Sequence, residues 1–207
     1  KMVRTNDYLE PALRINEIDY PCWRESSRLR AVRADQIIES HKGRVNPSIL
    51  ASLLSDHVDA DRGRVRAFAQ AIAQPHNMTS VVFEPGEGVA WVAEGKAPVN
   101  AGAYRKVALW DKAQPDETLK DVSDPLPKKH REVFNRYLQA YSGWQKKKDP
   151  AAALAVLSEN VLGDPEEPVY RYMNGLFALK CGDWESAKNN FGAGAIQRLG
   201  ATAALAV

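Results

Sequence analysis

Two short patterns near the start of the chain contain residue types that can do chemistry. The first is Val3-Arg4-Thr5-Asn6, which ends in a carboxamide, and the second is Ser27-Arg28-Leu29-Arg30-Ala31, which opens with a hydroxyl and a guanidinium. Each pattern alone has an ordinary interpretation, because an asparagine after a strand is usually a turn residue and a serine before a helix usually caps it. Their order and their spacing of about 22 residues are what make them informative.

The other polar residues form none of the usual catalytic or metal-binding constellations. The glycines of Pro85–Gly88 belong to a hairpin turn that no helix follows, and the sequence has no Gly-x-Ser-x-Gly motif. The four histidines, His41, His57, His76 and His130, are not spaced as metal ligands. The run Lys146–Lys148 is better explained as a solvated helix end than as a nucleic-acid patch. We therefore expect neither a metal nor a cofactor.

Composition indicates an ordinary globular protein. The 207 residues are 44% hydrophobic and 26% charged, and 28 Lys and Arg against 26 Asp and Glu give a net charge of +2. Such a balance provides no strong attraction to nucleic acid or to an anionic membrane. No apolar run reaches the ~18 residues of a spanning helix. Cys22 and Cys181 lie far apart, which excludes a disulfide scaffold and leaves the compartment undetermined.

Sequence patterns predict two helices and a hairpin in the first half of the chain. Ser26 or Ser27 is expected to cap a helix that runs to about residue 40, and Asn46-Pro47-Ser48 is expected to open a second helix through residue 56. Residues 79–84 and 89–93 are predicted strands joined by a turn at 85–88. Val81, Val82 and Phe83 are consecutive apolar residues, so apolar side chains lie on both faces of this strand. We therefore expect the sheet to lie between a second sheet and a helix layer.

The second half has a helical pattern with a 34-residue repeat. Residues 94–128 are predicted to be a long connection, with residues 111–127 as the linker, and helices follow from Lys128. Residues that match across 34 positions include the pairs Asp149 and Asp183, Ala153 and Ala187, and Leu157 and Phe191. The second copy, with Gly175, Ala178 and Trp184, resembles a tetratricopeptide repeat. A generic helical hairpin is the alternative, and two repeats are expected to need further packing, because each helix pair buries its apolar face only against a neighbour.

Together and in this order, the two patterns near the start resemble the second half of N-terminal-nucleophile hydrolases of the choloylglycine hydrolase and penicillin (isopenicillin N) acyltransferase type. That family has Thr-Asn at a strand end and Ser-Arg opening a helix, then an Asp-His element, a His-x-x-Thr segment and an apolar hairpin. The corresponding stretches are Leu53–His57, Gln74–Thr79 and the hairpin to Ala93, and Gly95–Pro98 resembles the Gly-x-Pro that follows. The resemblance covers about residues 1–105.

The resemblance implies cleavage or transfer at a linear amide. In such enzymes a cysteine at the chain terminus attacks the amide carbonyl, and its own α-amino group serves as the base. Asn6 matches the carboxamide that donates to the tetrahedral oxyanion. Arg28 matches the helix-opening arginine, a permanent cation that favours thiol ionisation or holds a substrate carboxylate.

The chain also departs from the family pattern. Asp7 stands where the family often has histidine, which puts a negative charge close to the pocket. Neither Cys22 nor Cys181 can offer a free α-amino group, so this chain alone lacks a nucleophile. We expect it to begin inside a longer protein whose upstream segment carries the nucleophile, and to be inert on amides by itself.

These observations lead to one interpretation and its alternatives. The predicted fold is α+β: residues 1–110 form part of an αββα N-terminal-nucleophile hydrolase sandwich, 111–127 a linker, and 128–207 an all-α tetratricopeptide-like region of four helices. The predicted function is that of part of a linear-amide hydrolase or acyltransferase, acting with the upstream segment on a small amide. The alternative is a non-catalytic module whose helices bind a peptide partner, and a third possibility is a family member that has lost catalysis. Nucleic acid and membranes are not expected as partners.

Overall fold

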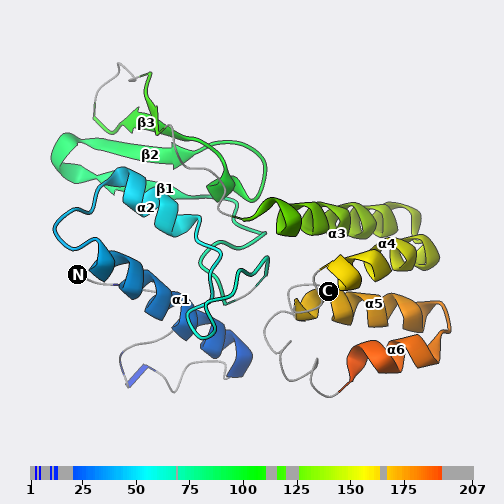
Figure 1. Ribbon diagram of the computed structural model, residues 1–207. Coiled ribbons are helices and arrows are strands. Elements are labelled where there is room, and N and C mark those ends of the chain that lie inside the picture. Colours follow the sequence, from blue (N-terminus) through cyan, green and yellow to red (C-terminus); the bar gives the residue numbers. More distant parts are fainter. Residues whose placement is uncertain are drawn as a thin grey trace. The chain divides into compact units, whose positions relative to one another are not determined.

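The computed structural model (Figure 1) describes residues 3, 5, 10, 12–13, 21–68, 70–110, 116–119, 126–163 and 167–192. These residues form six α-helices and one four-stranded antiparallel sheet, so the fold is α+β. The chain divides into two compact units, one made from residues 1–15 and 26–126 and the other from residues 16–25 and 127–207.

The elements follow one another along the chain in the order helices, sheet, helices. Their bounds are α1 Pro21–Ser40, α2 Pro47–Leu54, β1 Val81–Glu84, β2 Val89–Ala93, β3 Tyr104–Ala108, β4 Thr118–Leu119, α3 Lys128–Lys147, α4 Pro150–Gly163, α5 Pro168–Lys180 and α6 Trp184–Phe191. None of the helices among the described residues combines the length and the apolar character needed to cross a membrane.

The predicted start of α2 is confirmed. The side chain of Asn46 accepts a hydrogen bond from the backbone N–H of Ile49 at 2.9 Å, and Pro47 occupies the first turn. The helix ends at Ser55, whose hydroxyl donates to the carbonyl of Asn100. The side-chain amide of Asn100 in turn donates to the carbonyl of Leu54 at 3.0 Å. The end of α2 is therefore fastened to the segment between β2 and β3.

The predicted hairpin is also confirmed. β1 and β2 pair in antiparallel register with Val82 opposite Trp91, and a short 3₁₀ turn at Pro85–Glu87 connects them. Gly88 closes the turn in the left-handed conformation at φ 65°, which glycine adopts without a steric penalty.

Two further strands lie where the sequence predicts a connection. β3 pairs with β2, and the two-residue β4 pairs with β3, so Thr118 and Leu119 of the expected linker belong to the sheet. The remaining linker residues 111–115 and 120–125 lie outside the described residues. β3 was missed because its sequence, Tyr104–Ala108, contains Arg105 and Lys106 and follows a stretch rich in glycine and proline that is typical of a connection. Pairing with β2, which is distant in sequence, fixes this strand.

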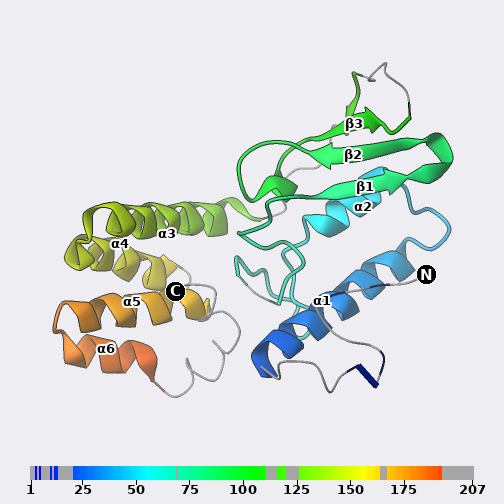
Figure 2. The ribbon, with the colours of Figure 1, turned by 180° about the vertical axis from the view of Figure 1, so that it is seen from behind.

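One face of the sheet packs on α2 (Figures 1 and 2). Residues paired directly across antiparallel strands share a face, and on this face Val82, Trp91 and Tyr104 are at most 4% exposed. They form one core cluster with Ala51 of α2. The hydroxyl groups of Tyr104 and Ser80 are 2.5 Å apart, which satisfies the polar end of the buried tyrosine.

The other face of the sheet is mainly apolar and is open at β1. The register places one charged residue, Arg105, and five apolar residues on this face: Val81, Phe83, Ala90, Val92 and Val107. Phe83 is 63% exposed, and the three valines are only partly buried. Among the described residues, α2 supplies a helix layer for one face only, so the expectation that both faces are covered stays a prediction.

Four helices, α3 to α6, make up the described part of the second unit after residue 126. Each packs against the next in sequence (Figure 1). A Cβ atom placed on Gly175 of α5 would lie 2.8 Å from the ring of Phe191 on α6, closer than real Cβ contacts occur. The glycine is thus required by the close approach of these two helices.

We predict that Gly175→Ala lowers the free energy of unfolding by about 1–3 kcal/mol, because the new methyl group overpacks the contact with Phe191. Gly143→Ala in α3 is the matched control. Its Cβ meets no atom within 4 Å, so the higher helix propensity of alanine should raise stability by about 0.5–1 kcal/mol. Urea unfolding measures both changes, and equal effects of the two substitutions would contradict the assigned contact.

Candidate functional site

The sequence assigns a catalytic role to two residues, and the structure describes only one of them. Asn6 lies outside the described residues. Arg28 lies in α1, where its side chain is exposed, and no ion pair or hydrogen bond of its side chain is found among the described residues. The structure therefore does not show the two side chains in one site.

The pattern around Arg28 does not open a helix, which corrects the expected cap at Ser26 or Ser27. α1 begins at Pro21, a residue that suits the first helical turn because its missing N–H has no helical partner there. Ser27 is 1% exposed, and its hydroxyl has no hydrogen-bond partner within the described part of the chain. Leu29, at 3% exposure, is buried beside it, so Arg28 lies on the outer face of the helix.

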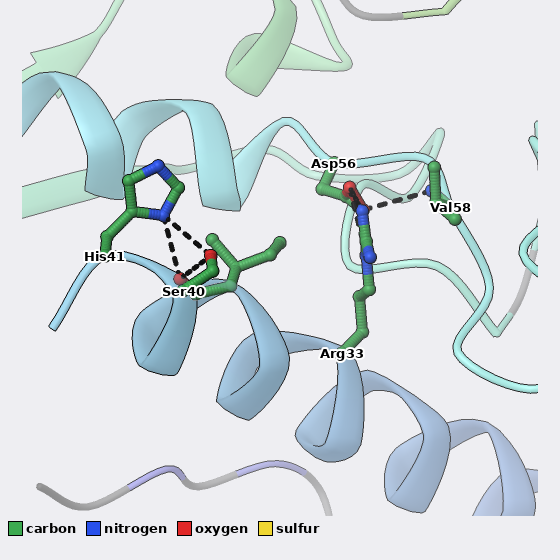
Figure 3. Close-up of polar contacts among 6 residues, drawn as sticks. Arg33, Ser40, His41, Asp56 and Val58 are labelled. Carbon is green, nitrogen blue, oxygen red and sulfur yellow. Dashed lines mark hydrogen bonds and ion pairs between the residues drawn. The ribbon is translucent and has the colours of Figure 1, made fainter.

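A forked polar contact of α1 is made by a residue that the sequence analysis did not select, Arg33. Arg33 donates from Nε to both carboxylate oxygens of Asp56, at 2.9 and 3.2 Å, and from Nη2 at 2.8 Å (Figure 3). The carboxylate also accepts from the backbone N–H of Val58 at 3.1 Å. Donation to Asp56 raises the pKa of Arg33 above its ordinary value. This forked pair joins α1 to the segment that follows α2.

A second contact joins α1 to the same segment. The backbone N–H of Gln70 donates to the hydroxyl of Ser26 at 3.1 Å, and the side chain of Gln70 accepts from Arg66 at 2.7 Å. Gln70 adopts φ 56°, in the left-handed region that side chains other than glycine disfavour. Residues 55–74 are thus held on α1 near both ends of the segment.

Two of the four histidines, His41 and His57, contact backbone carbonyls, and His76 of the His-x-x-Thr segment is exposed. Nδ1 of His57 lies 2.9 Å from the carbonyl of Arg66, within the same segment. Nδ1 of His41 lies 2.9 Å from the carbonyl of Ile37, at the end of α1 (Figure 3). Among the described residues, no three His, Cys, Asp or Glu side chains converge in a group that could hold a metal ion.

The ion pair of Arg33 and Asp56 could not be recognised from the sequence. The two residues are 23 positions apart, and Arg33 is one of several arginines in α1. The only available signal was the Asp-His element itself, since a carboxylate directly after an apolar helix needs a partner if it is buried.

The chain matches no known protein in the comparisons: no protein family, no curated protein and no solved structure is significantly similar to it. The interpretation of the site therefore depends on its residues and their geometry.

We predict that Asp56→Asn lowers the free energy of unfolding by about 1.5–3 kcal/mol, the cost of losing charged hydrogen bonds at a site where Asp56 is only 9% exposed. The matched control is Glu94→Gln. Glu94 pairs with Arg105 at 2.9 Å, but both side chains are 51% exposed, so this change should cost less than about 1 kcal/mol. Chemical denaturation that gives the two variants the same stability would refute the anchoring role of Asp56.

Proposed function

We propose that this chain is part of a linear-amide hydrolase or acyltransferase whose cysteine nucleophile is carried by an upstream segment of the same protein. The resemblance of residues 1–105 to the choloylglycine hydrolase and penicillin acyltransferase type supports this proposal. In the complete protein, Asn6 donates to the oxyanion of the tetrahedral intermediate. Arg28 provides a permanent cation to the nucleophile or to a substrate carboxylate.

The observation that carries the proposal is the open apolar face of the sheet. α2 covers the face of Trp91 and Tyr104, whereas Phe83 on the opposite face is 63% exposed. One half of an αββα sandwich has this arrangement, with a helix layer on one side and a face for a second sheet on the other. The proposed upstream segment supplies that second sheet together with the nucleophile.

The exposure of Arg28 is compatible with the same assembly. Arg28 is exposed and is therefore accessible to a layer or substrate added from outside. A solvated arginine contributes little to the stability of this unit, so its removal should affect function without unfolding the protein.

We predict that Asn6→Ala in the complete protein lowers kcat by about 10²–10³, equivalent to about 2.7–4 kcal/mol of barrier, because one oxyanion donor is lost. Turnover is measured with a panel of N-acyl-4-nitroanilides. Asn189→Ala removes an exposed carboxamide from α6 and is the control, with unchanged turnover expected. Unchanged turnover of Asn6→Ala would exclude Asn6 from the mechanism.

We also predict that Phe83→Glu destabilises the complete protein by at least about 2 kcal/mol, because a second sheet would enclose the new carboxylate. Met78→Glu is the control. Met78 is 73% exposed and precedes the sheet, so this substitution should alter the free energy of unfolding by no more than about 0.5 kcal/mol. Thermal unfolding with equal midpoints for the two variants would contradict a covering sheet.

Intact mass adds a separate test, since an N-terminal cysteine released by cleavage would leave the protein as two chains.

A second candidate function, a protein-binding module built on tetratricopeptide-like helices, is supported by the backbone of α3 to α6. Residues 34 positions apart have equivalent roles. Lys148 and Gly182 both adopt positive φ, at 56° and 80°, and the next residues, Asp149 and Asp183, cap α4 and α6 with their carboxylates. The pair Ala153 and Ala187 is buried in both copies, each at 3% exposure.

A further inference from the structure

Four exposed lysines lie at the ends of α3 and α5 in the second unit, and two of them lie over one indole ring. Lys146 and Lys147 form the last turn of α3, Lys148 follows them, and Lys180 ends α5. The ammonium groups of Lys148 and Lys180 lie 5.1 and 5.5 Å from the centre of the Trp144 ring. Within the described part of the chain, none of these four ammonium groups forms an ion pair.

The helix dipole accounts for only part of this lysine cluster. Cations are favoured near the carboxyl end of a helix, which explains Lys147 and Lys180. It does not explain Lys148, which has φ 56° and ψ 29°, a conformation that favours glycine. The equivalent residue of the next helix pair is Gly182 at φ 80°. The chain thus has a lysine at a position whose backbone conformation favours glycine, and the lysine's ammonium group lies over Trp144 and donates to the side chain of Gln145 at 3.4 Å.

The nearby carboxylates Asp149 and Asp183 are already used by the backbone. Asp149 accepts from the N–H groups of Ala151 and Ala152 at 3.0 and 3.1 Å. Asp183 accepts from the N–H of Ser186 at 3.0 Å. Each therefore satisfies the start of the following helix and does not pair with the lysine cluster.

Positive charge is concentrated on α3 and α5 and is not spread over the helical unit. α3 contains six lysines and arginines and one glutamate, and α5 contains two basic residues and no acidic one. In contrast, α4 has one glutamate and no basic residue, and α6 has one residue of each sign. Trp144, near the end of α3, meets Phe177 of α5 edge-on with ring centres 5.2 Å apart, and the ammonium group of Lys180 lies 5.5 Å from the Trp144 ring. The basic residues at the ends of α3 and α5 therefore belong to one surface.

Apolar side chains accompany the positive charge. Leu179, beside Lys180, is 38% exposed, and Leu138 on α3 is 41% exposed. The ring of Trp144 is engaged by Phe177 and by two ammonium groups, which leaves it a poor stacking platform for a nucleic-acid base. Ammonium groups beside exposed leucines suit a peptide that carries both carboxylates and apolar residues.

We propose that the surface formed by the ends of α3 and α5, centred on the lysine cluster, binds an acidic peptide segment of a partner protein. The carboxylates of the peptide pair with Lys146, Lys148 and Lys180, and its apolar side chains contact Leu179. This inference rests on the helical unit as a binding module and is independent of the amidohydrolase proposal, so loss of one leaves the other intact.

The test is fluorescence anisotropy with a labelled 12-residue peptide that contains four glutamates and two leucines, added to the full chain. The same peptide with glutamine in place of glutamate is one comparison, and a labelled 12-nucleotide oligothymidylate is the other. The variant Lys146→Gln/Lys148→Gln/Lys180→Gln removes three charges from the surface. Lys42→Gln/Lys96→Gln/Lys188→Gln removes three exposed charges elsewhere and is the matched control.

We expect the acidic peptide to bind at least tenfold more weakly to the first triple variant, with the control within twofold of the original chain. The peptide with glutamine in place of glutamate should bind to neither of the two triple variants. Lys148→Gly should raise the thermal midpoint and yet weaken peptide binding, a combination that a purely structural lysine would not produce. Equal binding by both triple variants, no binding by the original chain, or tighter binding of the oligothymidylate with the same charge dependence would overturn the proposal.

Discussion

An antiparallel sheet with apolar residues on both faces needs a layer on each side to keep those residues from water, and α2 provides only one. The packing of Trp91, Tyr104 and Ala51 accounts for the covered face. On the opposite face, full burial of a side chain such as Phe83 is worth about 1.5–3 kcal/mol, a gain that is largely absent at 63% exposure. The amide-hydrolase interpretation depends on this unfilled requirement, since a second sheet would satisfy it and bring the missing nucleophile.

The position of Arg28 follows from contacts made by its neighbours in α1. Arg33 binds Asp56 and Ser26 binds the backbone of Gln70, and together these contacts fix the rotation of the helix about its axis. With Leu29 buried, Arg28 is left on the outer face. A role for this arginine therefore requires that a substrate or another layer approach α1 from outside. The open face of the sheet likewise requires a layer that comes from outside the described residues.

Local signals made part of the fold predictable from the sequence. The hairpin was recognisable because Pro85–Gly88 supplies its own turn chemistry, and α2 because Asn46 and Pro47 form a helix start. Gly175 was singled out in the copy that resembles a tetratricopeptide repeat, and the close approach of Phe191 gives a direct steric cause for a small residue there. β3 was missed since its existence depends on pairing with a distant strand.

The features of the candidate site that the sequence did not predict were missed for physical reasons as well. The start of α1 was placed six or seven residues late because a serine inside a helix looks the same in sequence as a serine that caps one. The Arg33–Asp56 pair depends on how α1 meets the segment after α2, a tertiary relation that no local pattern encodes. The α+β class and the helices of the second half thus followed from short-range rules, whereas contacts across the chain did not.

Hydroxyl-radical footprinting of the complete protein, read by mass spectrometry, tests the central claim most directly, because it reports the solvent exposure of single side chains without substitution. The account predicts that Phe83 is protected while Met78 and Trp110, at 73% and 85% exposure, are oxidised at the rates of open side chains. Oxidation of Phe83 at the rate of a side chain in open solvent would show that no second sheet covers the face, and would contradict the account.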